Sequence, residues 1–197
     1  MFRIALALVF FLSGHTIAFA NPLHDAARDG DVEKVSGLID QGVAMDVPGD
    51  NGETPLILAI LGGQPAVVEL LIEKGADIRA RNSGGFTALH AAAYVGDVDA
   101  AGKLLGNGAN VDDQENKAGV TPLSVAAEEG HVEMARVLVE HGANIEAGER
   151  NGYTPLSRAL WRDHKEVVSL LQRSGAACQP AKILGKPVHS RCVAGSP

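Results

Sequence analysis

The apolar positions of residues 119–147 fall into two clusters, and each cluster predicts a short helix. The first has small side chains, which let a neighbouring helix approach closely, and consists of Leu123, Val125, Ala126 and Ala127. The second has the spacing of one helix face and consists of Val132, Ala135, Val137, Leu138 and Val139. Gly130 and Gly142 follow the two clusters, and glycine is the residue that most readily ends a helix. We therefore expect a helix–turn–helix unit here.

Thr121 and Pro122 mark the start of the first predicted helix. A threonine hydroxyl can accept a hydrogen bond from an unpaired backbone N–H at a helix start. Proline fits the first helical position, because its missing N–H is not needed there. The polar, glycine-bearing segment 144–152 predicts a turn that leads to the next such start.

The same unit recurs through most of the chain. Thr-Pro-Leu begins at Thr54, Thr121 and Thr154, and Thr-Ala-Leu begins at Thr87, in steps of 33, 34 and 33 residues. Asn21 keeps this frame one step before Thr54. Glycines repeat with the same period at Gly42, Gly75, Gly108, Gly142 and Gly175. Because one helix pair cannot bury its own apolar face, we expect five stacked copies that share a core.

The unit resembles the ankyrin repeat. It places Thr-Pro-Leu-His, Ala-Ala, Gly, Leu-Leu and Gly-Ala at fixed offsets, and the third copy carries these motifs in residues 87–93, 104–105 and 108–109. The resemblance implies an all-α ankyrin-repeat solenoid of five helix–turn–helix repeats with β-hairpin-like turns. The expected repeats are about 21–50, 51–82, 83–116, 117–149 and 150–180, followed by a tail over 181–197.

The copies depart from the family pattern in a few places. The motif histidine is replaced by Ile57, Ser124 and Ser157 in the second, fourth and fifth copies. Asp163 stands where the other copies have a glycine between the helices, and one residue is inserted in the loop 112–117. We expect these departures to change local geometry and to leave the fold intact.

Residues 1–20 differ from the rest of the chain and are typical of a cleaved secretory signal peptide. Arg3 is their only charged residue, residues 4–12 are uniformly apolar, and Ala18 and Ala20 offer the small side chains that precede a cleavage site. The alternative is a membrane anchor, but the apolar run is shorter than the ~20 residues that cross a bilayer. We expect the mature protein to begin at Asn21 and to have no membrane attachment.

The charge balance disfavours some partners. The chain has a formal net charge of −7, which becomes one unit more negative without Arg3. We expect an acidic surface without clusters, which argues against nucleic acids and anionic membranes as partners.

Two cysteines, Cys178 and Cys192, lie near the C-terminal end. In an exported protein such a pair predicts a disulfide, and the alternative is a redox-active or metal-binding pair. The tail also carries apolar residues that can cover the last repeat. We expect Ile183, Leu184 and Val188 to lie over Val167, Leu170 and Leu171, with the disulfide holding them there.

Motifs of catalysis are missing from the sequence. It contains no G-x-S-x-G, P-loop, G-x-G-x-x-G or H-E-x-x-H pattern. His24 and His90 occupy the family position that stabilises the turn, and His131 and His164 are expected at the surface early in the second helices. We therefore expect no catalytic residues, no metal and no cofactor.

Four aromatic residues follow the predicted signal: Phe86, Tyr94, Tyr153 and Trp161. The resemblance implies that partners contact the turn tips and the concave face of the first helices, and all four residues fall at those positions. The alternative for Phe86 and Tyr153 is packing on a neighbouring turn. Glu53 and Arg150 share this face, and the expected partner-binding residues are Leu61, Arg81, Phe86, Tyr94, Val95, Val120, Glu128, Glu129, Tyr153, Trp161 and Arg162.

The expected function is non-catalytic binding of one exported protein by a monomeric module. A bacterial periplasm is the expected location, and secretion is the alternative. The resemblance implies an inhibitor, immunity or scaffold role. The alternatives are a secreted effector that binds host proteins, and an enzyme.

Overall fold

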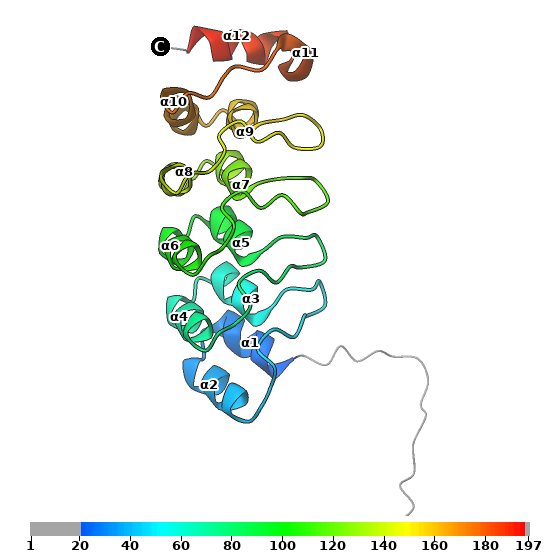
Figure 1. Cartoon of the computed structure of the whole chain (residues 1–197), viewed down its shortest axis with the longest axis vertical. Coiled ribbons are helices and arrows are strands. Elements are labelled where there is room, and N and C mark those ends of the chain that lie inside the picture. The colour runs from blue at the N-terminus through cyan, green and yellow to red at the C-terminus, as the bar shows by residue number, and fades with distance from the viewer. Residues whose placement is uncertain (1–20, 196–197) are drawn as a thin grey trace, which may run out of the picture.

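The computed structural model describes residues 21–195, so the predicted signal peptide lies outside the described residues. Within this range the chain forms twelve helices and no strand, which confirms the all-α solenoid. Two rows of helices run side by side along the long axis of the molecule, and long turns project from one side (Figure 1). None of the helices in this range is long and apolar enough to cross a membrane.

The two rows hold the first and second helices of successive repeats. The first helices are α1 (Pro22–Asp29), α3 (Pro55–Leu61), α5 (Ala88–Val95), α7 (Pro122–Glu129) and α9 (Pro155–Arg162). The second helices are α2 (Val32–Asp40), α4 (Pro65–Glu73), α6 (Val98–Gly106), α8 (Val132–Glu140) and α10 (Lys165–Arg173). Each pair lies within one of the five ranges expected from the sequence.

The first helices begin as their threonines predict. The Oγ1 atoms of Thr54, Thr121 and Thr154 accept hydrogen bonds from the backbone N–H three residues later, at 3.3, 3.0 and 3.4 Å. Asn21 caps α1 by accepting from the N–H of Leu23 at 3.1 Å. Each such cap stabilises its helix by about 1 kcal/mol.

One continuous core runs through the stack. The leucine of the repeated motif is at most 1% exposed in every repeat, at Leu23, Leu56, Leu89, Leu123 and Leu156. The second helices add Leu71, Leu104, Leu138 and Leu171, all fully buried. The predicted apolar cluster of α8 is partly wrong: Val137 is only half-buried and Met134 is buried, because the core-facing stripe runs through Met134, Ala135 and Leu138.

The turns between repeats are hairpin-like and line up with one another. In three turns a backbone N–H donates across the turn at 2.9 Å: Gly49 to Glu53, Asn82 to Phe86, and Glu149 to Tyr153. Adjacent turns are linked by Ser83 N–H to Asn51 O, Lys117 N–H to Gly84 O and Arg150 N–H to Ala118 O, at 2.8 to 3.3 Å. The turns therefore form a ladder along one side of the stack.

Motif histidines tie a first helix to the next turn, as the family position implies. His90 Nε2 lies 3.0 Å from Val120 O, and His24 Nε2 lies 3.1 Å from Glu53 O. His90 Nδ1 also meets Thr87 Oγ1 at 3.0 Å. His24 Nδ1 has no partner among the described residues, because Asn21 occupies the threonine position.

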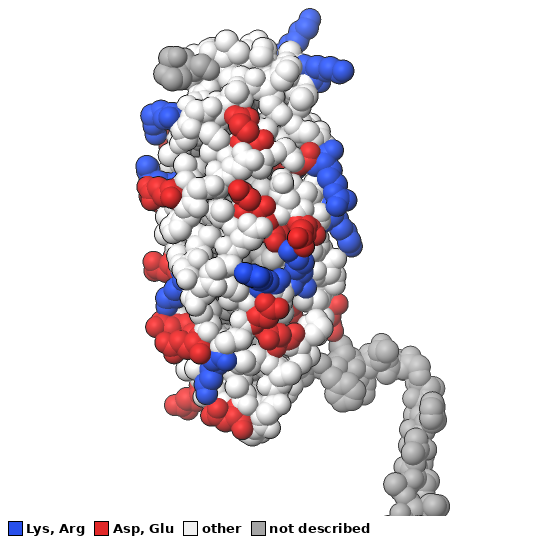
Figure 2. Space-filling view, viewed as in Figure 1, with Lys and Arg blue, Asp and Glu red and all other residues white. Residues whose placement is uncertain are grey.

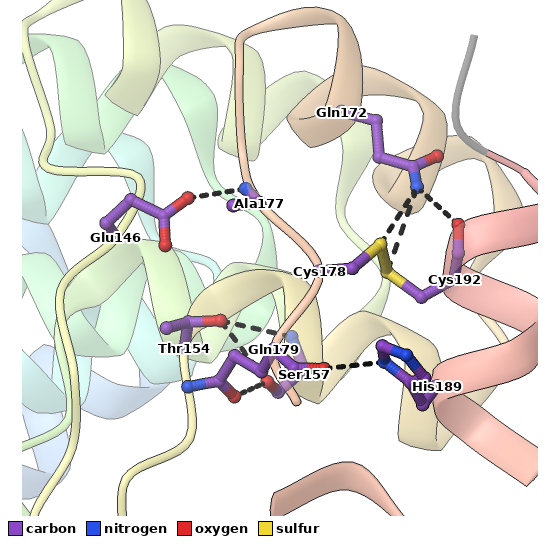
Figure 3. The surroundings of a disulfide bond; sticks show 9 residues. All are labelled: Glu146, Thr154, Ser157, Gln172, Ala177, Cys178, Gln179, His189 and Cys192. Carbon is purple, nitrogen blue, oxygen red and sulfur yellow. Dashed lines mark hydrogen bonds between the residues drawn. A yellow bond between two sulfur atoms is a disulfide. The ribbon is translucent and has the colours of Figure 1, made fainter. Parts of the chain in front are cut away.

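The C-terminal tail forms a helical cap, and the predicted disulfide between Cys178 and Cys192 is confirmed (Figure 3). The cap comprises α11 (Ala181–Leu184) and α12 (Lys186–Ala194). Leu184 and Val188 are buried in the common core, as expected. The expectation for Ile183 is wrong: this side chain is 37% exposed, because Leu184 takes the inward position in the single turn of α11.

Polar contacts join the cap to repeat five (Figure 3). The Gln172 side chain donates to Cys192 O at 3.0 Å, and His189 Nδ1 meets Gln179 O at 2.8 Å. The Gln179 side chain also contacts Ser157 and donates to Gly152 O, the latter at 2.6 Å. Gln179 thus fills the role of the missing motif histidine in repeat five.

Asp163 keeps the geometry of the glycine that it replaces. Its φ of 61° is in the left-handed region, where the corresponding Gly130 has a φ of 80°. Aspartate tolerates this conformation better than most residues. Its carboxylate also pairs with Arg191 of the cap at 2.9 Å.

Candidate partner-binding face

Exposed apolar side chains concentrate at the C-terminal ends of the first helices. The described residues have seven exposed large apolar side chains, and four of them lie at the ends of α3, α5 and α9: Leu61, Tyr94, Val95 and Trp161. Tyr94 is 55% exposed and Trp161 is 52% exposed. We call the surface formed by these helix ends and the adjoining turns the binding face.

An apolar hollow of ≈370 Å³ lies on the binding face between repeats two and four. Three expected contact residues, Leu61, Phe86 and Tyr94, line it together with Ile57 and Val125. Such a concave apolar surface can receive an aliphatic or aromatic side chain of a partner. The hollow therefore brings together residues from repeats two, three and four that are far apart in the sequence.

Phe86 satisfies both interpretations of its position. Its ring packs edge-on against the buried His90 ring, with centroids 5.3 Å apart, so it stabilises its own turn. The remaining half-exposed part of the ring lines the apolar hollow.

A second, mixed hollow of ≈300 Å³ lies where repeats four and five meet. It is lined by Glu128, Tyr153, Arg158, Trp161 and Arg162. The Tyr153 and Trp161 rings meet edge to face with centroids 6.4 Å apart, and the Arg158 guanidinium lies 5.5 Å from the Tyr153 ring centre. These contacts order two aromatic rings before any partner arrives.

Ion pairs position the two arginines of the mixed hollow. Glu128 accepts from Arg158 at 3.2 Å and from Arg162 at 2.6 Å. Arg158 also pairs with the fully buried carboxylate of Glu149, and the hydrogen bond to Glu149 is the main reason that the pKa of Arg158 is raised. Arg158 is therefore fixed in place, while Arg162 keeps 60% of its side chain exposed.

The sequence analysis did not identify Arg158, although the sequence contains a signal. The matching positions hold Leu58, Ala91 and Val125 in repeats two to four and Asp25 in repeat one, so Arg158 is the one basic residue in this frame. Its partner Glu149 lies in the preceding turn, and only the three-dimensional register brings the two together.

Arg81 lies apart from both hollows and has a structural role. Its guanidinium donates to both Asp113 oxygens, at 2.7 and 2.6 Å, and to Glu115 at 3.0 Å. The hydrogen bond to Asp113 raises the pKa of Arg81. Burial pushes the pKa of Asp113 upward, but the hydrogen bond and charge of Arg81 outweigh burial, so the net pKa is lowered.

Val120 does not belong to the binding face, and this expectation is corrected. Its side chain is 8% exposed, and its N–H and O atoms bond to the Asn116 side chain at 2.9 and 2.6 Å. Asn82 makes the equivalent bond to the N–H of Phe86 in repeat three, at 3.0 Å. Val95 and Glu129 are exposed as expected, but they line neither hollow.

His131 and His164 hold the ends of the first helices in place, a role that the sequence analysis missed. Their Nε2 atoms lie 2.9 Å from the backbone oxygens of Tyr94 and Glu128, respectively, in the preceding repeat. Gln64 makes the equivalent bond to Arg28 O at 3.1 Å. Gln64, His131 and His164 therefore fix the backbone at the ends of α1, α5 and α7, whereas Asp97 before α6 caps its own helix.

The chain belongs to the ankyrin-repeat family. The family model described as ankyrin repeats (three copies) matches residues 7–82, 23–115 and 89–181. Ankyrin repeats are generally protein–protein interaction modules, and the family is generally non-enzymatic. No group of three or more His, Cys, Asp or Glu side chains within residues 21–195 is arranged to hold a metal ion.

Curated relatives share only the repeats. The chain is 44% identical over 98 residues to the mouse (Mus musculus) neurogenic locus notch homolog protein 1, which covers 49% of this chain and 4% of that protein. It is 37% identical over 98 residues to the Arabidopsis thaliana E3 ubiquitin-protein ligase KEG, covering 47% and 6%. The inactive serine/threonine-protein kinase TEX14 of Bos taurus is 34% identical over 89 residues, covering 45% and 6%.

Proposed function

We propose that this protein is a non-catalytic interaction module that binds one exported protein outside the cytoplasm. The observation that carries the proposal is the arrangement of exposed aromatic and apolar side chains around two hollows on one face. Tyr94 and Leu61 border the apolar hollow, and Trp161, Tyr153 and Arg162 border the mixed hollow. Tryptophan, tyrosine and arginine are the residues most enriched among those that dominate binding energy.

The exposed rings favour a binding role over a packing role. A tryptophan that is 52% exposed gains little from the core, and covering it with a partner removes its apolar surface from water. The ion pairs of Glu128 and the bonds of His131 and His164 hold the face in one conformation. A preorganised face loses less conformational entropy on binding.

The proposed location outside the cytoplasm has two supports. The first is the predicted signal peptide, and the second is the disulfide of the cap, because disulfides persist in oxidising compartments. A periplasm meets both conditions. A module without catalytic groups acts there as an inhibitor, an immunity protein or a scaffold for its partner.

Trp161→Ala tests the proposal once a protein that co-purifies from an extracytoplasmic extract has been identified. The change should weaken affinity by at least ~2 kcal/mol, which is about 30-fold in Kd, because it removes the central ring of the mixed hollow. Stability should fall by no more than the ~0.5–1.5 kcal/mol of the ring pair with Tyr153. Titration calorimetry and thermal melting measure the two quantities.

Val32→Ala is the matched control, because Val32 is 36% exposed on α2, in the row of second helices and outside repeats two to five. It should change neither affinity nor stability. If Trp161→Ala instead costs ~3–5 kcal/mol of stability, the residue belongs to the core. If it changes neither quantity, the partner binds another face.

A further inference from the structure

The charges of the chain are segregated along the stack, which corrects the expectation of an acidic surface without clusters. Residues 150–195, here called the basic end, contain only two acidic residues, Asp163 and Glu166. Their basic residues are Arg150, Arg158, Arg162, Lys165, Arg173, Lys182, Lys186 and Arg191. The basic end carries a formal charge of +6 and residues 21–149 carry −14, which together with Arg3 give the −7 of the whole chain.

Most of this positive charge is free to act on a partner. Every basic residue of the basic end except Arg158 is exposed. Arg158, Arg162 and Arg191 form ion pairs, whereas the other five form none with any residue in the described range. In Figure 2 the lysines and arginines stand out at the α11–α12 end, while acidic side chains crowd toward the α1–α2 end.

Four of the five residues that line the mixed hollow belong to the basic end, and the fifth, Glu128 of repeat four, pairs with Arg158 and Arg162. Arg150 belongs to the same turn as Tyr153, where Glu149 N–H donates to Tyr153 O, and Arg162 follows Trp161 directly. The cap adjoins this turn through the Gln179 side chain, which donates to Gly152 O at 2.6 Å. The turn, the end of α9 and the cap therefore all carry basic residues, and the first two also carry the half-exposed Tyr153 and the exposed Trp161.

We infer that the basic end recognises an acidic segment of the protein partner, with an apolar residue of that segment packed on Trp161 and Tyr153. The inference rests on the proposed function and adds the chemistry of the partner to it. Carboxylates pair with exposed guanidinium and ammonium groups, and the opposed potentials steer the two molecules together. The negative charge of residues 21–149 repels the same segment, so it confines binding to one end.

The geometry favours a protein segment over other acidic ligands. A bilayer is flat, whereas the Trp161 and Tyr153 rings line a hollow between a turn and a helix end. A nucleic-acid duplex carries charge along its whole length, and most of this stack would repel it. A second copy of the chain offers acidic surface, so self-association is one outcome to be measured.

Trp161 is the only tryptophan of the chain, so its fluorescence reports on the site directly. The probe is a short peptide of repeated Glu-Glu-Leu units, and the control probe replaces each Glu by Gln. We expect the acidic peptide to change Trp161 emission and the Gln peptide to do so at least about tenfold more weakly. Raising sodium chloride from about 50 to about 300 mM should weaken the binding of the acidic peptide about tenfold, because salt screens exposed charges.

A charge-reversed variant locates the interaction. The triple change Arg150→Glu, Lys182→Glu and Lys186→Glu alters three exposed residues without ion pairs, so the fold is retained, which circular dichroism and a thermal melt verify. The variant should bind the acidic peptide at least about tenfold more weakly than the wild type does. Arg28→Glu, Lys34→Glu and Lys74→Glu make the same change of net charge near the other end and should alter binding by less than about threefold.

Four outcomes would overturn the inference: equal binding of the two peptides, indifference to salt, equal binding by the two charge-reversed variants, or no change of Trp161 emission. Tighter binding to anionic vesicles than to the peptide would favour a membrane, and a salt-sensitive dimer in light scattering would favour a second copy. If the natural partner binds the charge-reversed variant normally but not Trp161→Ala, the inference fails while the proposed function stands.

Discussion

His90 is a single residue that joins two repeats. Its Nδ1 atom accepts from Thr87 N–H at 3.3 Å, and its Nε2 atom lies 3.0 Å from Val120 O, an arrangement that suits the neutral ring with a proton on Nε2. The ring is 2% exposed. Burial lowers the pKa of His90, and the hydrogen bond to Val120 and the charge of Asp113 oppose this only in part.

The lowered pKa makes His90 a source of acid sensitivity. His90 has a pKa of about 6.5 in the unfolded chain. Below that pH the unfolded chain binds a proton on His90 more readily than the folded chain does, so the free energy of unfolding decreases as pH falls below about 6.5. One such group adds a slope of at most about 1.4 kcal/mol per pH unit. The lowered pKa of Asp113 acts in a separate window, where stability is lost as pH falls below about 4.

Urea unfolding of wild type and His90→Gln at pH 7.5 and pH 5.5 measures this contribution. We expect the variant to lose less stability between the two pH values than the wild type does. His141→Gln, at the exposed end of α8, is the control and should keep the wild-type dependence. Equal pH dependence in wild type and His90→Gln would contradict the assignment.

Residues whose role is local were predictable, and residues whose role depends on register were not. Thr54 caps its own helix, so the repeated motif identifies it without a structure. Arg158 depends on Glu149, nine positions earlier in a turn, and on Glu128 in the previous repeat. Val120 has a surface position in the family frame, but its side chain is 8% exposed, and the Asn116 side chain bonds to its backbone.

At the scale of elements, the cap shows how a repeat array is closed. α9 and α10 would expose apolar residues to water at the last repeat, and Leu184 and Val188 cover them. The apolar residues and the cysteine pair made the cap predictable from sequence. The inward-facing residue of α11 was not predictable, because α11 is a single turn and the path of the chain out of repeat five decides which residue faces the core.

The disulfide should contribute measurably to stability. Cys178 and Cys192 are 14 positions apart, and closing a loop of this size is worth about 3 kcal/mol in the chain-entropy model. Reduction should therefore lower the melting temperature by roughly 6–12 °C. Scanning calorimetry with and without reductant measures the shift.

A variant with both cysteines changed to alanine is the control, and it should melt at one temperature whether or not reductant is present. Thiol titration of unfolded wild type without reductant provides an independent check. Two titratable thiols in protein from an oxidising compartment would contradict the disulfide.

At the scale of the whole molecule, the stack separates two kinds of recognition. The apolar hollow lies between repeats two and four in the acidic part, and the mixed hollow lies where the basic end meets repeat four. A partner that spans both must place an apolar group at one and acidic groups at the other. Two sites of different chemistry at a fixed separation allow a rigid solenoid to discriminate among proteins that match only one of them.

The two ends of the stack are closed in different ways, and the difference gives unfolding a direction. Within residues 21–195, repeat one packs on α3 and α4, whereas repeat five packs on repeat four and on a cap that is covalently tied back to it. In a repeat array each unit is stabilised only by its neighbours, so local opening begins where neighbours are fewest. The chain should therefore fray from α1 and α2 and stay closed longest at α9 and α10.

Hydrogen–deuterium exchange followed by mass spectrometry measures this gradient. Amides of α2 should exchange fastest among the second helices, with protection rising repeat by repeat toward α10. Reduction of the disulfide should abolish the difference in exchange rate between the two ends of the stack. If α10 exchanges as fast as α2 in the oxidised protein, the proposed direction of unfolding is wrong. Because the mixed hollow lies at the slow-exchanging end, it should persist in partly opened molecules that have already lost repeat one.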